Sequence, residues 1–159
     1  MLENLIKKYK EKDVNEVVYR LSYAGKFIII KGKTLCGSLI IIANTYDQFT
    51  RGRDRFAGHL YTHLYNHVWG KTGSKFTIKT LAKVGPKFSQ YQLLKREQME
   101  LDKNRYNKSC LNNATEVYIP LYSETTDTFG WLGKAAVMNF KKWLDSKERK
   151  AYVKRYTVK

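Results

Sequence analysis

Two β-forming runs separated by a tight turn constrain the fold more than any other part of this sequence. Val17–Tyr23 is rich in β-branched and aromatic residues, and Phe27–Ile30 is a short apolar run of the kind that forms a buried strand. Ala24-Gly25-Lys26 lies between them and contains the glycine that a tight turn favours. The chain is therefore predicted to form a β-hairpin near its beginning.

The hydrophobic pattern elsewhere predicts one further strand and several helices. Residues 75–81 alternate between polar and apolar at period two, which is typical of a half-buried strand. Ser89 and Gln92 have the spacing of a capping box, so a helix is expected to begin there and to extend over residues 90–107. Residues 39–42 fit either a strand or a helical turn. The other expected helices cover residues 1–12, 59–69 and 134–144.

These elements predict one α+β domain over residues 1–145. We expect a small, three-stranded, mostly antiparallel sheet flanked by helices, and a basic tail over residues 146–159. A chain of 159 residues is long enough for one such domain with its own core.

Nothing in the sequence predicts a membrane or secreted protein. The longest apolar run, Leu39–Ala43, is far shorter than the roughly 20 residues of a membrane-spanning helix. No apolar stretch of a secretory signal follows Met1. Cys36 and Cys110 do not have the spacing of a disulfide framework or of a metal site. We therefore expect a cytoplasmic protein with two ordinary thiols and no membrane partner.

The charge of the chain points to a polyanionic partner. Thirty Lys and Arg residues stand against fourteen Asp and Glu, which gives a formal net charge of +16. Self-repulsion among so many cations opposes folding, and nucleic acid is the commonest polyanion that relieves it. The alternatives are a surface that serves solubility, an anionic lipid or an acidic protein.

The basic residues concentrate in two regions, residues 71–96 and 134–159. The second region also carries Trp143, Tyr152 and Tyr156, whose rings can stack on bases. The alternative for this region is a solvated helix face with a frayed tail. The residues expected to contact phosphates are Lys31, Lys71, Lys75, Arg96, Lys141, Lys142 and Arg155.

Three histidines share one face of the helix expected over residues 59–69. His59, His63 and His67 are four residues apart. A zinc site needs further ligands, and no Cys, Asp or Glu completes such a set by motif. A polar groove or phosphate contacts are therefore the favoured role of these side chains.

A carboxylate also lies on the inward stripe of the helix expected over residues 90–107. Glu97 is spaced to share a face with Leu93 and Leu101, and a carboxylate there needs a cation, a metal or hydrogen bonds. The alternative is a surface glutamate that pairs with Arg96 or Lys103. Taken singly, Tyr19 fits strand packing and Lys33 fits a solvated lysine.

Taken together, these residues resemble the GIY-YIG nuclease family over residues 17–119. The family has a Gly-Ile-Tyr strand and, about ten residues later, a Tyr-Ile-Gly strand; here Val17-Val18-Tyr19 and Ile30-Lys31-Gly32-Lys33 stand at these places. The family continues with an Arg and a His on the next helix, a Glu on a later helix and an Asn near the end. The residues that match these positions are His59, His63, Glu97 and Asn112.

The resemblance implies a metal-dependent endonuclease that hydrolyses phosphodiester bonds. Tyr19 would help to activate water, with Lys33 or His63 assisting proton removal, and Glu97 would hold one Mg²⁺ (or Mn²⁺) against the phosphate. The sequence departs from the family at Ile30, which replaces a Tyr, and at His59, which replaces the Arg.

Three functions therefore stand as expectations. The first is a Mg²⁺-dependent endonuclease that acts on DNA, and the second is a catalytically inactive DNA-binding protein on the same fold. The segment Leu93–Pro120 also resembles short proteins of tailed phages of gut Bacteroidetes, so the second includes a structural virion protein that contacts other virion proteins, located in the virion or the host cytoplasm. The third is an RNA-binding protein, with DNA the favoured nucleic acid.

Overall fold

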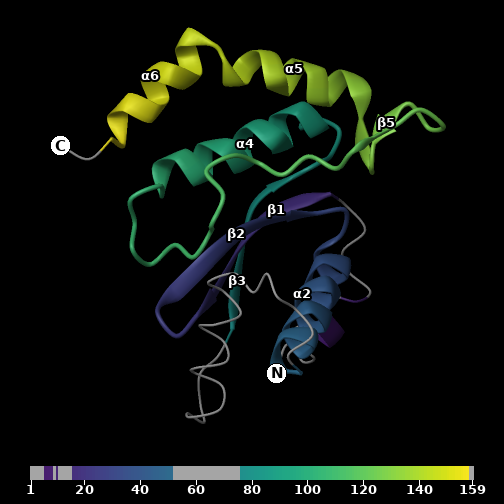
Figure 1. Cartoon of the computed structure of the whole chain (residues 1–159), viewed down its shortest axis with the longest axis vertical. Helices are drawn as coiled ribbons and strands as arrows, with labels where there is room; N and C mark the ends of the chain where they lie inside the picture. The colour runs from purple at the N-terminus through teal and green to yellow at the C-terminus, as the bar shows by residue number, and fades with distance from the viewer. Residues whose placement is uncertain (1–5, 9, 11–15, 52–75, 158–159) are drawn as a thin grey trace.

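The computed structural model describes residues 6–8, 10, 16–51 and 76–157 and stacks them in layers (Figure 1). Helices α5 (Lys134–Leu144) and α6 (Lys147–Arg155) lie on helix α4 (Gln90–Lys103). Helix α4 lies on one face of a three-stranded sheet, and helix α2 (Leu35–Thr50) lies on the other side. The expected α+β class, with a small antiparallel sheet and a C-terminal helix, is confirmed.

The sheet is built around the predicted hairpin. Strands β1 (Val17–Tyr23) and β2 (Lys26–Gly32) pair antiparallel, and β3 (Thr77–Lys83) pairs antiparallel with the other side of β1. The order β2-β1-β3 makes β2 an edge strand. The hairpin turn places Ala24 and Gly25 at φ of 49° and 78°, a backbone conformation that glycine adopts without strain.

Alternation along the strands divides the core into two clusters. Even-numbered Val18 of β1 and odd-numbered Ile29 of β2 pack with the leucines of α4, whereas Tyr19 packs with Leu39 of α2. The cluster on the α4 face contains Val18, Phe27, Ile29, Ala82, Leu93, Leu94, Leu101, Val117, Leu132, Val137, Phe140 and Trp143. The cluster on the α2 face contains Val17, Tyr19, Leu21, Ile28, Leu35, Leu39 and Ile42.

Several expected boundaries differ from the structure. The ambiguous residues 39–42 belong to α2. The strand expected over residues 75–81 is Thr77–Lys83 in the described chain. Helix α4 begins with the predicted capping box but ends at Lys103 rather than residue 107, because the Asn104 side chain bonds to the Glu100 carbonyl and the chain then turns. The helix over residues 134–144 is confirmed, and those over residues 1–12 and 59–69 lie mostly or wholly outside the described residues.

The C-terminal end is where the fold departs most from the sequence interpretation. Residues 147–155 were expected in a separable tail, but they form α6, which the Ser146 side chain caps. Arg149 and Tyr152 attach α6 to α4 through bonds to Asp102 and the Met99 carbonyl. The sequence also did not predict a second small sheet of two-residue strands, β4 (Tyr122–Ser123), β5 (Thr128–Phe129) and β6 (Leu132–Gly133).

Candidate functional site

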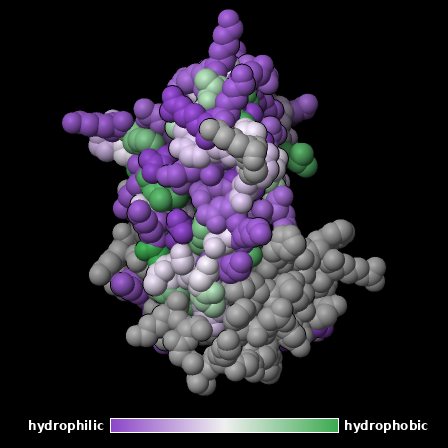
Figure 2. Space-filling view, turned by 90° about the vertical axis from the view of Figure 1, so that its left-hand side faces the viewer, coloured by the Kyte–Doolittle hydropathy of each residue, from purple (hydrophilic) through white to green (hydrophobic). Residues whose placement is uncertain are grey.

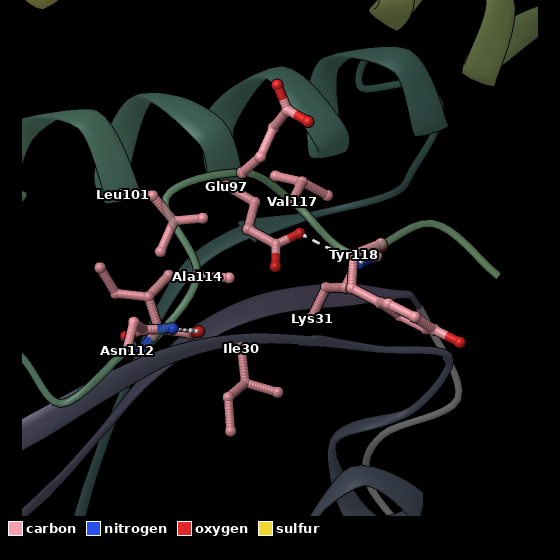
Figure 3. Close-up of a pocket in the computed structure, with 10 residues that line it drawn as sticks. Ile30, Lys31, Glu97, Leu101, Asn112, Ala114, Val117 and Tyr118 are labelled. Carbon is pink, nitrogen blue, oxygen red and sulfur yellow. Dashed lines mark hydrogen bonds and ion pairs between the residues drawn. The ribbon is translucent and has the colours of Figure 1, made fainter. Parts of the chain in front are cut away.

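Glu97 faces inward from α4, as its position on the apolar stripe predicts, and it is buried against β2. Its Oε2 lies 3.3 Å from Lys31 Nζ, and the two side chains are only 7% and 8% exposed. Burial raises the pKa of the Glu97 carboxyl above its usual value, and the charge of Lys31 opposes that shift. Of the two alternatives for this glutamate, the structure therefore supports the inward carboxylate paired with a cation, and that cation is Lys31 (Figure 3).

Lys31 connects strand β2 to helix α4 and to the segment that follows α4. It follows Phe27 and Ile29 on the α4 face of β2, because side chains alternate along a strand. Its ammonium group also donates to the carbonyl oxygen of Tyr118, in the segment that follows α4 along the chain. The prediction that Lys31 contacts nucleic-acid phosphates is not supported, because its charge is buried and already paired.

Asn112 continues the hydrogen bonding of the edge strand β2. Its Oδ1 accepts from the Ile29 N–H at 2.9 Å, and its Nδ2 donates to the Ile29 carbonyl at 2.8 Å. The neighbouring backbone does the same for Phe27, which bonds to the Ser109 carbonyl and the Leu111 N–H. Asn112 therefore closes the sheet edge, and both ends of its amide are occupied by backbone groups.

Glu97, Lys31 and Asn112 line one cavity of about 270 Å³ between α4, the edge of β2 and the segment after α4 (Figure 3). Its remaining lining is largely apolar, apart from Glu116. The structure thus brings two of the family-matched residues, Glu97 and Asn112, to one place. The full lining is Ile29, Ile30, Lys31, Glu97, Leu101, Asn112, Ala114, Glu116, Val117 and Tyr118.

Tyr19 is not at this cavity. Its side chain is fully buried on the α2 face of the sheet, where its hydroxyl lies 2.6 Å from Ser38 Oγ. Glu97 packs over the α4 face, so the sheet separates the two residues. In the described structure Tyr19 cannot activate water beside Glu97 as the resemblance implied.

The other family-matched positions are also apart from Glu97 or outside the described residues. Lys33 is exposed in the β2–α2 connection and lines a different, mostly apolar groove of about 590 Å³. His59, His63, Lys71 and Lys75 lie outside the described residues. Within the described chain, no three His, Cys, Asp or Glu side chains are placed to hold a metal ion together.

The donor set around Glu97 does not fit a Mg²⁺ ion. Mg²⁺ takes oxygen ligands in near-octahedral geometry and is usually held by one or two carboxylates with water and phosphate oxygens. Here the carboxylate faces an ammonium group, and the Asn112 amide oxygen already accepts from Ile29. The most direct role of the Glu97–Lys31 pair is to attach β2 and residue 118 to α4.

The remaining predicted phosphate contacts lie on the outer helices. Arg96 pairs with Glu100 one turn later, at 3.1 Å, and Lys141 lies over the Phe129 ring, 5.1 Å from its centroid. Lys142 and Arg155 are exposed. Of these four, Lys141, Lys142 and Arg155 have no carboxylate partner among the described residues.

The sequence interpretation missed a second buried polar network on α4, which Gln98 and Asp102 form. Asp102 is 1% exposed and accepts from Arg149 at 3.1 Å and from Gln98 at 2.9 Å. Gln98 in turn donates to the Thr115 carbonyl and accepts from the Val117 N–H, both at 2.9 Å. The sequence signal was available, because Gln98 and Asp102 continue the inward stripe of Leu94 at four-residue spacing.

Comparisons with known proteins identify no relative. No protein-family model, curated protein or solved structure matches the chain. In the part of the chain that the structure describes, no helix has the length and apolar character needed to cross a membrane.

Proposed function

We propose that this protein binds nucleic acid, with duplex DNA as the ligand, and that it does so without cleaving it. The observation that carries the proposal is the exposed surface of α5 and α6. Here six exposed cations have no carboxylate partner among the described residues: Lys141, Lys142, Lys147, Lys150, Lys154 and Arg155. With a formal net charge of +16, such a surface favours a polyanion through phosphate contacts and counterion release.

Binding without cleavage is favoured because the family-matched polar residues have structural roles. Glu97 is paired with Lys31, Asn112 with the Ile29 backbone, and Tyr19 with Ser38 on the opposite side of the sheet. A nuclease needs these groups converged on one phosphate. The resemblance to GIY-YIG nucleases then concerns the fold, retained for holding DNA.

A Mg²⁺-dependent endonuclease is the second candidate. It is favoured by one observation, the location of the Glu97 carboxylate in the wall of a cavity of about 270 Å³. A metal there would have to replace the Lys31 ammonium group as the partner of Oε2.

Two measurements on the full chain test the proposal. Fluorescence anisotropy with a short labelled DNA duplex should show tight, sequence-independent binding that weakens steeply with added KCl. Neutralising Lys142, Lys150 and Arg155 to Gln should weaken it more than neutralising Lys83, Lys87 and Lys103, which removes the same charge elsewhere. Weak binding with a shallow salt dependence, or equal loss in both triple variants, would overturn the proposal.

Plasmid nicking with Mg²⁺ or Mn²⁺ separates the two candidates. We expect no cleavage by the wild-type protein. Metal-dependent nicking that disappears in both Glu97→Gln and Tyr19→Phe would establish the endonuclease instead.

A further inference from the structure

The three-stranded sheet carries an unusual pair of like charges. Arg20 of β1 and Lys79 of β3 are directly opposite partners in the antiparallel register. Side chains of opposite partners share a face and lie about 5 Å apart at Cβ, and like charges there destabilise the sheet. No Asp or Glu occurs in β1, β2 or β3 to offset them.

The guanidinium group of Arg20 is held in place, and among the described residues it has no hydrogen-bond acceptor. It lies over the Phe27 ring, 3.5 Å from the ring centroid. Within the described residues, no carboxylate or carbonyl accepts a hydrogen bond from Arg20 or Lys79. Lys31, on the same face, differs in having Glu97 as its partner. An arginine held over an aromatic ring keeps N–H donors that can contact a phosphate at two points.

A path that contains the cations Lys150 and Arg105, here called the basic path, connects this pair to α6, and Arg105 also pairs with Asp102 at 3.3 Å. Lys150 of α6 and Arg105 line one small cavity, and Arg105 and Cys110 line the next. The backbone of Cys110 forms an isolated parallel β-bridge with that of Phe27, and the Phe27 ring lies under Arg20. Residues 103–115 contain no acidic residue. This end of the molecule faces the viewer in Figure 2, where hydrophilic residues cover most of the described surface.

Two more lysines lie at the margin of the pair. Lys26, at the start of β2, donates to the carbonyl oxygen of Lys108 at 3.0 Å, which holds the hairpin against the segment after α4. The Lys108 side chain is exposed beside it. The cations therefore come from three separate parts of the chain, which the fold gathers at one end.

We propose that Arg20 and Lys79 bind a backbone phosphate of the same DNA duplex that contacts α5 and α6, with Lys26 and Lys108 at the margin of this contact. The inference rests on the proposed function and adds a second contact to it. Lys79 is exposed and Arg20 is half-buried, so both can reach a phosphate at the surface, and a duplex lying along the basic path supplies phosphates at both ends of it. The bound phosphate also offsets the repulsion between the two cations.

The test compares two double variants of the full chain with equal charge. Arg20→Gln/Lys79→Gln removes the proposed contacts, and Lys83→Gln/Lys87→Gln removes two exposed lysines elsewhere. In anisotropy titrations with a labelled DNA duplex, we expect the first to lose affinity by about 10- to 100-fold and the slope of log K against log [KCl] to fall by about 2. The control should change affinity by only a few-fold.

Each outcome decides the question. Equal loss in both double variants, or wild-type affinity in Arg20→Gln/Lys79→Gln, overturns this site and leaves the proposed function in place. No binding of DNA by the wild-type protein overturns both. If Arg20→Gln/Lys79→Gln loses binding to an RNA duplex but binds DNA as the wild-type protein does, the site is assigned to RNA and the proposal is overturned. Competition by millimolar inorganic phosphate at constant ionic strength would show a site for the free ion instead.

Cys110 supplies a local readout that general weakening of binding does not move. Burial raises the pKa of the Cys110 thiol above its usual value, and the hydrogen bond with Asn112 and the charge of Arg20 oppose that shift. A phosphate bound at Arg20 cancels that charge, so saturating DNA should slow the alkylation of Cys110 in the wild-type protein. The same amount of bound DNA should not slow it in Arg20→Gln/Lys79→Gln, and equal slowing in both would place the phosphate elsewhere.

Discussion

The buried Lys31–Glu97 pair offers the sharpest test of how this fold is held together. At the observed 3.3 Å separation, and with an effective dielectric constant of about 20, the attraction between the two charges is about 5 kcal/mol. Removing them from water offsets most of that attraction. Breaking such a pair at one end should nevertheless cost about 3–5 kcal/mol, because the other charge stays buried without a partner.

A double-mutant cycle separates these terms. We expect Lys31→Met and Glu97→Leu each to lower the free energy of unfolding by about 3 kcal/mol or more, and the double variant to lie within about 1 kcal/mol of the wild type. Urea unfolding followed by circular dichroism measures all four proteins. The Arg96–Glu100 pair, 3.1 Å apart but with Arg96 44% exposed, is the control on the same helix, and its coupling should be about 0.5 kcal/mol or less.

Two results would refute this reasoning. Single effects that simply add in the double variant would show that the two charges do not depend on each other. The same cycle repeated with Mg²⁺ tests the metal role directly. If Glu97 held a metal, Lys31→Met would free the carboxylate and gain a Mg²⁺-dependent stabilisation that the double variant lacks.

Three further predictions follow from single contacts. In Lys31→Met the raised pKa of Glu97 should rise further, so this variant should regain stability as the pH falls from 7.5 towards 5, and a constant deficit in urea unfolding would contradict this. Asn112→Ala should cost about 1–3 kcal/mol and speed hydrogen exchange at the Ile29 amide, whereas unchanged exchange would mean that the two bonds add nothing. Lys79→Thr should raise stability by about 0.2–1 kcal/mol by removing the like charge across the strand, and a loss of stability would count against repulsion there.

The sign of the first of these predictions follows from proton binding. A carboxyl whose pKa is higher in the folded state than in the unfolded state binds its proton more tightly when folded. The stabilisation that this carboxyl gives to the folded state is therefore fully present below its unfolded-state pKa, and it is lost as the pH rises through its folded-state pKa. Without Lys31 to oppose the effect of burial, Glu97 should show this loss over a wider pH range.

Local patterns predicted the hairpin, the start of α4 and helix α5, because local physics decides these elements. The hairpin follows from two β-forming runs and a glycine turn, and the start of α4 follows from the Ser89–Gln92 capping box. The separable tail expected over residues 146–159 was a wrong prediction, because helix α6 depends on contacts with α4 rather than on a local pattern. Helix α6 has no buried residue of its own, so its sequence lacks the apolar stripe that marks a packed helix.

The candidate site was predicted only in part, because its partners are far apart in the sequence. Glu97 was expected to need a cation, but Lys31 could be found only by noting that it shares a strand face with Phe27 and Ile29. Tyr19 was placed with Glu97 by motif order alone, and motif order does not state which face of a sheet a residue occupies. The like-charge pair of Arg20 and Lys79 depends on the register of β3, which no local pattern gives.

The network around Asp102 implies that α6 and the wall of the Glu97 cavity are not independent. Arg149 binds Asp102, Asp102 binds Gln98, and Gln98 holds the Thr115 carbonyl and the Val117 N–H. Arg149→Leu should therefore remove about 3 kcal/mol of charged hydrogen bonding, because it deletes two bonds to a buried carboxylate.

Hydrogen exchange then shows how far the effect of Arg149→Leu travels. We expect faster exchange across α6 and also at the Val117 amide, with the amides shared by β1 and β2 unchanged, since local opening follows contiguous contacts. Lys150→Leu, at the neighbouring exposed position, is the matched control and should change neither region. Faster exchange confined to α6 would show that Asp102 only attaches the helix. Faster exchange in both regions would mean that a ligand seated on α5 and α6 also stabilises the cavity wall beside Glu97.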